Sequence, residues 1–261
     1  MKHIPNIFTL LNLFFGCIAI VLILQNGLVA TVNQNDEVLL MLPEKIYWAS
    51  VCIGIAAVVD FADGFVARLF NATSEMGKQL DSLADVVTFG VAPGMIVYQF
   101  LRLAFAQQEN GLDISIAWLL PAFIIPCAGA YRLARFNIDT EQSYGFKGVP
   151  IPAVGLLIAS FPLIYWYSNS EMVSAVLLNK WFWYVVIAVT SYLMVSTLPM
   201  IALKFKSTGM KSNLTKIILL VVAVLAGIFL KWLAVPVIFI AYVVLSLVTS
   251  KREIRIDERG R

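Results

Sequence analysis

The chain has 261 residues, of which 60% are hydrophobic and only 13% are charged, and its mean hydropathy is +0.85. A soluble domain usually carries about 25% charged residues, so this composition excludes a soluble globular fold, a disordered chain and a disulfide-stapled secreted module. The formal net charge of +3 is modest, and no basic stretch is long enough to indicate nucleic-acid binding. The sequence therefore predicts an all-α, polytopic integral membrane protein.

Apolar segments that could cross a bilayer recur along the chain. A span needs about 20 mostly apolar residues, because the hydrocarbon core is roughly 30 Å thick. Eight segments qualify, at about 5–25, 46–69, 82–106, 115–136, 149–168, 181–203, 214–231 and 233–250. Only Leu230–Lys231–Trp232 separates the last two, which indicates a tight turn at a membrane surface. We expect six to eight spans, with eight as the best single number, in one membrane domain (1–250) with a charged tail (251–261).

Basic residues divide unevenly between the two sides of such a bundle. With eight spans, 15 of the 19 Lys and Arg residues fall on the side that holds both termini, and 4 fall on the other side. Positive residues favour the cytoplasm. Both termini are therefore expected to face the cytoplasm, in the cell membrane, and the tail is expected to lie at the anionic cytoplasmic surface.

Four aspartates lie at the facing ends of the second and third apolar segments. Asp60 and Asp63 are three positions apart, and Asp81 and Asp85 are four apart, so on helices each pair shares one face. Carboxylates near a bilayer are costly, and the nearby basic residues are too few to neutralise four of them. Oxygen ligands without His or Cys favour Mg²⁺, Mn²⁺ or Ca²⁺ over Zn²⁺. The pattern predicts a divalent-metal site.

Small residues accompany the aspartates. Gly64, Ala67 and Gly77 would either let helices approach closely or leave room for a bulky ligand, and the sequence leaves both open. Arg68 lies one turn beyond Gly64 on the same face. Its guanidinium suits phosphate oxygens, although pairing with an aspartate fits nearly as well.

Together these residues read Asp60-x2-Asp63-Gly64-x2-Ala67-Arg68-x8-Gly77-x3-Asp81-x3-Asp85. This pattern resembles the signature of the CDP-alcohol phosphotransferase family at each fixed position. The signature covers 26 residues, and the layout of spans resembles the family over the whole chain. The resemblance implies a helical membrane enzyme that displaces CMP from CDP-diacylglycerol, with the hydroxyl group of an alcohol as the nucleophile.

The resemblance also implies roles for individual residues. Asp60, Asp63 and Asp81 would hold divalent metal, Mg²⁺ or Mn²⁺, at the diphosphate. Asp85 would ligate metal and also act as the catalytic base that deprotonates the attacking hydroxyl. The residues expected at CDP-diacylglycerol are Asn6, Thr9, Gly64, Ala67, Arg68, Ser74 and Gly77. Asn6, which follows a proline, is also typical of plain helix capping.

A second motif concerns the acceptor alcohol. The stretches Arg132–Asn137 (RLARFN) and Phe146–Ala153 (FKGVPIPA) resemble the branch of the family that uses L-serine. Serine has a carboxylate to anchor, so Arg132, Arg135 and Lys147 are the candidate acceptor-binding residues. The sequence does not decide between the two arginines. Basic residues at a cytoplasmic helix end also fit the helix dipole and the positive-inside rule without any ligand.

Alternatives remain at this stage. Glycerol 3-phosphate or inositol phosphate could replace serine in the same chemistry. A multi-span ion-coupled transporter would also carry intramembrane aspartates, but it predicts broken helices in matching halves, whereas these acids cluster in one hairpin. The resemblance further suggests a homodimer, for which Gly90, Ala92 and Gly94 could form a close helix contact.

Overall fold

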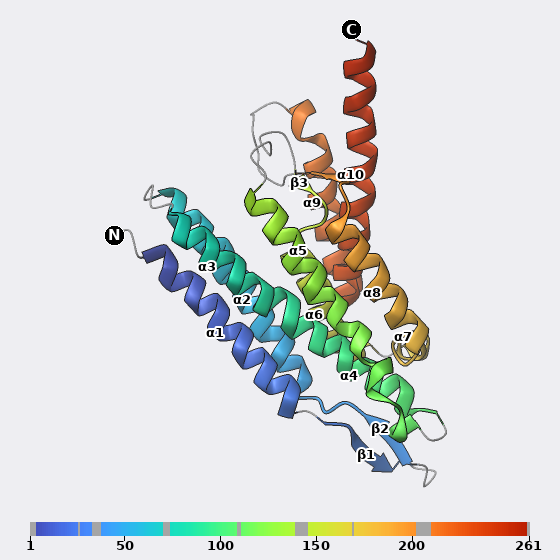
Figure 1. Cartoon of the computed structure of the whole chain (residues 1–261). Coiled ribbons are helices and arrows are strands. Elements are labelled where there is room, and N and C mark those ends of the chain that lie inside the picture. Colours follow the sequence, from blue (N-terminus) through green and yellow to red (C-terminus); the bar gives the residue numbers. More distant parts are fainter. Residues whose placement is uncertain are drawn as a thin grey trace.

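The computed structural model is built almost entirely from helices. It describes residues 4–25, 27–32, 38–69, 74–108, 111–138, 146–168, 170–201 and 210–259. The α-helices within these ranges are α1 (Ile4–Gln25), α2 (Ile46–Leu69), α3 (Glu75–Asp85), α4 (Ala92–Ala106), α5 (Ile124–Ile138), α6 (Ile151–Tyr167), α7 (Glu171–Leu177), α8 (Lys180–Val195), α9 (Met210–Leu230) and α10 (Ala234–Arg259). Figure 1 shows them as an elongated bundle, with the start of α1 and the end of α10 at the same end.

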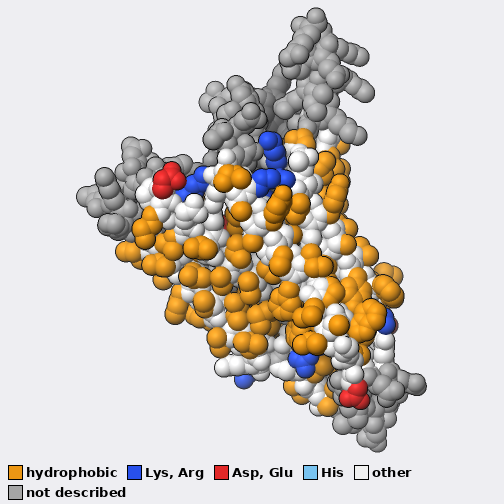
Figure 2. Space-filling model, viewed as in Figure 1, with side chains coloured by type: hydrophobic (Ala, Val, Ile, Leu, Met, Phe, Trp, Pro, Cys, Tyr) orange, Lys and Arg blue, Asp and Glu red, His pale blue; other side chains and the backbone are white. Residues whose placement is uncertain are grey.

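Among the described residues, four helical stretches are long and apolar enough to cross a membrane. They are Asn6–Gln25, Ile46–Val66, Glu75–Ala106 and Thr215–Thr249, and the pair α7 and α8, bent by 67°, makes a fifth if it counts as one span. On the face drawn in Figure 2, apolar side chains cover the middle of the molecule and charged side chains gather toward its two ends. The chain is thus mostly helical and has four or five candidate membrane spans within its described residues, fewer than the six to eight expected from the sequence.

The stretch Thr215–Thr249 contains a reversal. The 3₁₀ turn η5 (Lys231–Leu233) separates α9 from α10, and Lys231 has a φ of 50°. Because of this turn, α9 and α10 pack against each other as a hairpin. The tight turn expected at Leu230–Lys231–Trp232 is therefore present.

Two predicted segments have different helix bounds in the structure. The segment at 115–136 begins with two 3₁₀ turns, η3 (Ile116–Trp118) and η4 (Leu120–Phe123), so α5 starts only at Ile124. Pro121, which lacks an N–H, lies in the first turn of η4. The segment at 181–203 is helical only to Val195, because Ser196 leaves the helical conformation with a ψ of 158°.

Two short antiparallel strand pairs connect helices of the bundle. β1 (Val29–Val32) and β2 (Val38–Met41) form an antiparallel pair between α1 and α2, with Val29 opposite Met41. In Figure 1 this pair lies at the end away from the N-terminus. β3 (Phe146–Lys147) pairs with β4 (Pro199–Met200), which ties the start of α6 to the chain beyond α8. Both connections hold neighbouring helices together at their ends.

Glycines allow close packing around the π-helix η1 (Val86–Val91), which joins α3 to α4. A Cβ at Gly16 of α1 would collide with Thr88, and a Cβ at Gly155 of α6 would lie 2.8 Å from Phe89. Gly90 and Gly94 face Pro126 of α5, and a Cβ on either would lie 3.2 Å from that proline.

The expected role of small residues in a dimer contact is therefore wrong. Gly90, Ala92 and Gly94 are buried inside the protomer, where the first and last of them accommodate α5. Small residues permit close helix approach in either setting. The sequence pattern alone does not say whether the partner helix belongs to the same chain.

Candidate active site

Three of the four aspartates converge. Asp60 and Asp63, near the end of α2, and Asp81 of α3 each offer a carboxylate oxygen, and these oxygens lie within 4.8 Å of one another. Asp63 is only 7% exposed. Carboxylates this close repel when charged, and a cation between them relieves the repulsion. An all-carboxylate donor set of this kind fits a hard divalent ion.

Asp85 is not a member of this group of three. It is the last residue of α3, it is 6% exposed, and the π-helix η1 follows it directly. One turn of helix separates it from Asp81, and its carboxylate is not among the three convergent ones. π-helical turns often occur at functional sites. The structure thus places Asp85, buried to the same degree as Asp63, at the border of a cluster of three carboxylates.

Helix α1 supplies polar partners to both groups. The Thr9 hydroxyl donates to Oδ2 of Asp63 at 2.8 Å, and Nδ2 of Asn12 donates to Oδ1 of Asp85 at 3.3 Å. The Thr88 hydroxyl in turn donates to the Asn12 carbonyl oxygen at 3.2 Å. Thr9 and Asn12 are three positions apart, so they share one face of α1.

Asn12 is a site residue that the sequence analysis missed. It is fully buried, and it contacts Asp85 directly. A signal for it was present, because Thr9 and Asn12 are polar residues spaced by three within the apolar segment 5–25. Such a pair on a membrane helix marks a face that meets polar groups.

The expected nucleotide-binding residues Asn6, Ser74 and Gly77 lie together. Ser74 caps α3, and its Oγ accepts a hydrogen bond from the Gly77 backbone N–H at 3.0 Å. A Cβ at Gly77 would lie 3.1 Å from Ser74 Oγ and 3.2 Å from Asn6 Oδ1. Gly77 therefore lets the start of α1 approach the start of α3. The N-terminus of a helix, with its free N–H groups, suits anionic ligands.

Gly64 faces open space. A Cβ added to it would meet no described atom within 4 Å. This geometry excludes close helix packing as the role of Gly64 and leaves room for a ligand beside Asp63. Ala67 and Arg68 continue the same helix, but their side chains lie outside the described part of the structure.

The two arginines of α5 have different surroundings. Arg132 is 5% exposed, and Asp85 is among the charged groups that act on it. Arg135 instead donates from Nη1 to the Val195 carbonyl oxygen and from Nη2 to that of Ser196, both at 2.9 Å. Arg135 thereby caps the C-terminal end of α8, whereas Arg132 is buried on α5, and its Nε has no hydrogen-bond partner among the described residues.

Asn137, the last residue of the RLARFN stretch, connects two helices. Lys78 of α3 donates from Nζ to the Asn137 carbonyl oxygen at 3.0 Å, and Asn137 donates from Nδ2 to Ser82 Oγ at 2.8 Å. These bonds join α3 to the end of α5. The helix that carries Asp85 is therefore held against the helix that carries Arg132.

The FKG stretch is anchored to the end of α8. Lys147 is exposed in β3, and Gly148 has a φ of +76° and donates from its N–H to the Leu198 carbonyl oxygen at 2.8 Å. A Cβ at Gly148 would lie 2.5 Å from the Met194 carbonyl oxygen. Only glycine adopts this left-handed conformation at little cost, so Gly148 has a clear structural role.

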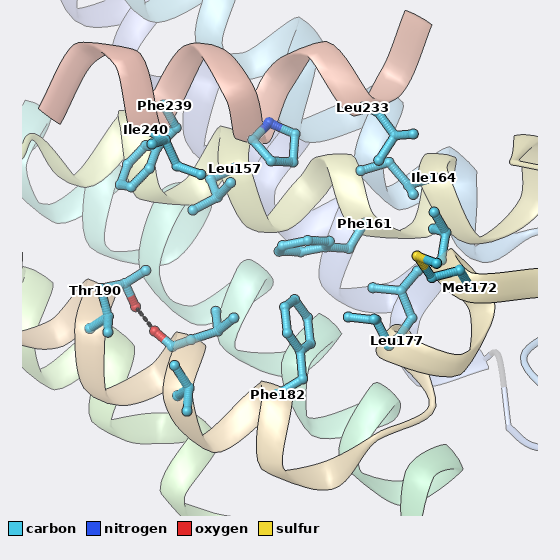
Figure 3. Close-up of a pocket in the computed structure, with 16 residues that line it drawn as sticks. Leu157, Phe161, Ile164, Met172, Leu177, Phe182, Thr190, Leu233, Phe239 and Ile240 are labelled. Carbon is cyan, nitrogen blue, oxygen red and sulfur yellow. Dashed lines mark hydrogen bonds between the residues drawn. The ribbon is translucent and has the colours of Figure 1, made fainter. Parts of the chain in front are cut away.

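A large apolar cavity lies away from the aspartates. It has a volume of about 430 Å³ and is lined by side chains of α6, α7, α8 and α10, including Phe161, Phe182 and Ile240 (Figure 3). Its one hydroxyl group, on Thr190, donates to the Val186 carbonyl oxygen at 2.7 Å. The cavity offers no free polar group for chemistry, so the aspartates and their neighbours remain the candidate site.

Comparisons with known proteins identify the family of this chain. The family model of the CDP-alcohol phosphatidyltransferases matches residues 2–181. A CDP-diacylglycerol–serine O-phosphatidyltransferase of Helicobacter pylori (strain J99) is 46% identical over 103 residues, which are 39% of this chain and 40% of that protein. The protein of the same name from Bacillus subtilis is 34% identical over 163 residues, 62% of this chain and 77% of its own length.

An archaeal relative is also similar. The archaetidylserine synthase of Methanothermobacter thermautotrophicus is 31% identical over 168 residues, 64% of this chain and 60% of that protein. The stretch matched by the family model includes the four aspartates and both arginines of α5. The resemblance seen in the signature is therefore confirmed, and the chain belongs to the CDP-alcohol phosphatidyltransferase family.

Proposed function

We propose that this protein transfers the phosphatidyl group of CDP-diacylglycerol to the hydroxyl group of L-serine, giving phosphatidylserine and CMP. The observation that carries the proposal is that Arg132 of α5 and Asp85 of α3 are both buried, and that α5 packs against η1, the segment that begins directly after Asp85. A buried cation near a candidate base suits a nucleophile that bears both a hydroxyl group and a carboxylate. The names of the relatives from Helicobacter pylori and Bacillus subtilis support the same acceptor.

Asp60, Asp63 and Asp81 are the residues that would hold a divalent ion, Mg²⁺ or Mn²⁺. Such an ion, when bound, neutralises negative charge on the diphosphate and on the departing CMP. The Thr9 hydroxyl holds one oxygen of Asp63 and so orients that carboxylate. Outer partners of this kind commonly tune the affinity of a site for metal.

Asp85 is proposed as the catalytic base. A serine hydroxyl is a weak nucleophile at neutral pH, and a carboxylate within hydrogen-bond reach can accept its proton as the new bond forms. The serine oxygen bonds to the lipid-side phosphorus, the bond from that phosphorus to the bridging oxygen breaks, and CMP leaves with the bonding electrons. The proton moves to Asp85, which Asn12 holds in place.

The nucleotide is proposed to bind where α1 meets α3. Asn6, Ser74 and Gly77 lie there, and Gly64 leaves open space on α2. Ala67 and Arg68 are assigned to the same ligand by their positions in the signature. The lipid chains would remain in the bilayer, because the aspartates lie near the ends of the membrane helices that carry them.

For the acceptor, we propose Arg132 as the partner of the serine carboxylate. Arg135 is already engaged with two carbonyl oxygens at the end of α8. Lys147 remains a candidate only for a supporting charge, since its side chain in β3 is exposed.

We also propose that the chain crosses the cell membrane eight times, with both termini and the aspartates on the cytoplasmic side. The start of α1 and the end of α10 lie at the same end of the bundle (Figure 1). Exposed tryptophans belong to turns and helix starts, at Trp48, Trp118, Trp181 and Trp232, and tryptophan is enriched at membrane interfaces. The family resemblance supports a homodimer, with an interface away from Gly90 and Gly94.

Release of CMP tests the proposed function directly. Purified protein is given CDP-diacylglycerol and Mg²⁺ or Mn²⁺, together with L-serine, glycerol 3-phosphate or inositol phosphate in separate reactions. We expect CMP and phosphatidylserine with L-serine, and little CMP with the other two acceptors. Equal release with glycerol 3-phosphate would contradict the serine assignment, and no release with any alcohol would favour the transporter alternative.

A further inference from the structure

Asn12 has an oxygen that the protein leaves without a partner. Its side chain is fully buried, and its Nδ2 donates to Asp85. A carboxylate oxygen in this contact accepts, so the amide nitrogen must face Asp85 and the amide oxygen must point elsewhere. That oxygen, Oδ1, has no hydrogen-bond partner among the described residues. A buried acceptor in this state carries a free-energy cost, which a ligand donor would remove.

Arg132 has a hydrogen-bond donor without a partner. Its Nε is also buried and also lacks a partner in the described structure. Arg132 comes from α5 and Asn12 from α1, and both helices pack against η1, the segment that begins directly after Asp85. Two helices that pack against the segment directly after Asp85 thus carry an unpartnered neutral acceptor and an unpartnered cationic donor.

We infer that Asn12 Oδ1 accepts a hydrogen bond from the α-ammonium group of the acceptor amino acid, while Arg132 pairs with its carboxylate. This inference rests on the proposed function. L-serine carries its ammonium and carboxylate groups on Cα and its hydroxyl group on the adjacent Cβ, and the three groups need an acceptor, a cation and a base. Asp85, Asn12 and Arg132 provide them.

A neutral amide is well suited to this position. A fifth carboxylate would bind ammonium more strongly, but it would add charge to a cluster that already contains Asp60, Asp63, Asp81 and Asp85. The amide oxygen accepts from ammonium without that repulsion. Glycerol 3-phosphate and inositol phosphate have no ammonium group, so Asn12 would favour an amino-acid acceptor over both.

The first test replaces Asn12 with leucine, which has a similar size but no amide. The matched control is Ser50→Ala, because Ser50 Oγ is also buried and unpartnered but lies ten residues before Asp60, about 15 Å away along α2. In the Asn12→Leu enzyme we expect the KM for L-serine to rise roughly 10-fold or more, with the KM for CDP-diacylglycerol changed less than about 3-fold. A KM for L-serine that stays near the wild-type value would overturn the inference.

The second test separates ammonium binding from a purely structural role of Asn12. Two analogues compete with L-serine: ethanolamine, which lacks the carboxylate, and 3-hydroxypropanoate, which lacks the ammonium group. Asn12→Leu should weaken competition by ethanolamine and leave competition by 3-hydroxypropanoate unchanged. Arg132→Leu should weaken competition by 3-hydroxypropanoate and leave competition by ethanolamine unchanged. Equal weakening of both analogues by Asn12→Leu would mean that Asn12 acts only through Asp85, and would overturn the ammonium assignment.

The wild-type enzyme provides a measurement that needs no variant. If Asn12 recognises ammonium, 3-hydroxypropanoate should compete at least about 10-fold less well than L-serine. Equal competition would overturn the inference even if Asn12→Leu fails to fold. Failure of the proposed function looks different, because wild-type protein would then release no CMP with L-serine at all.

Discussion

The Thr9 hydroxyl donates a hydrogen bond of 2.8 Å to the Asp63 carboxylate, across 54 positions of sequence. Both side chains are buried, with exposures of 4% and 7%. This bond joins α1 to the cluster of three aspartates and occupies one oxygen of Asp63. The orientation of a candidate metal ligand therefore depends on a residue outside the family signature.

Replacing Thr9 with valine keeps the shape of the side chain and removes the hydroxyl group. We expect the concentration of Mg²⁺ or Mn²⁺ needed for half-maximal activity to rise about 10- to 100-fold, the usual effect of losing an outer partner of a metal ligand. The measurement is CMP release against metal concentration. Thr190→Val is the control, since the Thr190 hydroxyl bonds only within α8. An unchanged metal dependence in Thr9→Val would show that Asp63 does not need this bond.

Metal removal tests the cluster as a whole. Because Asp60, Asp63 and Asp81 bring three carboxylates within 4.8 Å, we expect a chelator to abolish CMP release and added Mg²⁺ or Mn²⁺ to restore it. The assay uses wild-type protein freed of metal by dialysis. Full activity in such a preparation would remove the basis of the proposed mechanism.

Because Asp85 is not one of the three convergent carboxylates, it should respond differently from them to the same substitution. Asp85→Asn should bind CDP-diacylglycerol nearly normally but lose turnover by about 100-fold or more, the usual size of a general-base contribution. Asp60→Asn should weaken metal binding, so that excess metal partly restores its rate. Turnover against metal concentration is measured for both variants. If excess metal rescues both equally, Asp85 is only another ligand.

The two arginines of α5 should also respond differently. Arg132→Ala should raise the KM for L-serine by roughly 10- to 150-fold, because it removes a charge-assisted hydrogen bond. Arg135→Ala should instead lower stability by about 1–3 kcal/mol, because Arg135 bonds Val195 and Ser196 at the end of α8. Kinetics and thermal unfolding in detergent are compared for the pair. A larger KM effect in Arg135→Ala would reverse the assignment.

Sequence was informative where spacing along one helix decides the geometry. Asp60 and Asp63 share a face of α2 because they are three residues apart, and this relation holds in any fold that keeps the helix. Long apolar runs similarly predict membrane helices, because the bilayer sets their length. Helix ends were less predictable, as at Ile124 and Val195, where prolines and 3₁₀ turns shorten an apolar segment.

The sequence by itself determined the family, the four aspartates and the helical membrane fold, because each depends on local spacing or composition. Only the tertiary structure decided that Arg135 caps α8, while Arg132, three residues earlier, is buried and its Nε has no partner among the described residues. It also placed Asn12 in hydrogen-bond contact with Asp85, which lies 73 positions away in the sequence. The physical reason is that neighbouring residues on a helix point in different directions, and what each side chain meets depends on which distant helices pack around it.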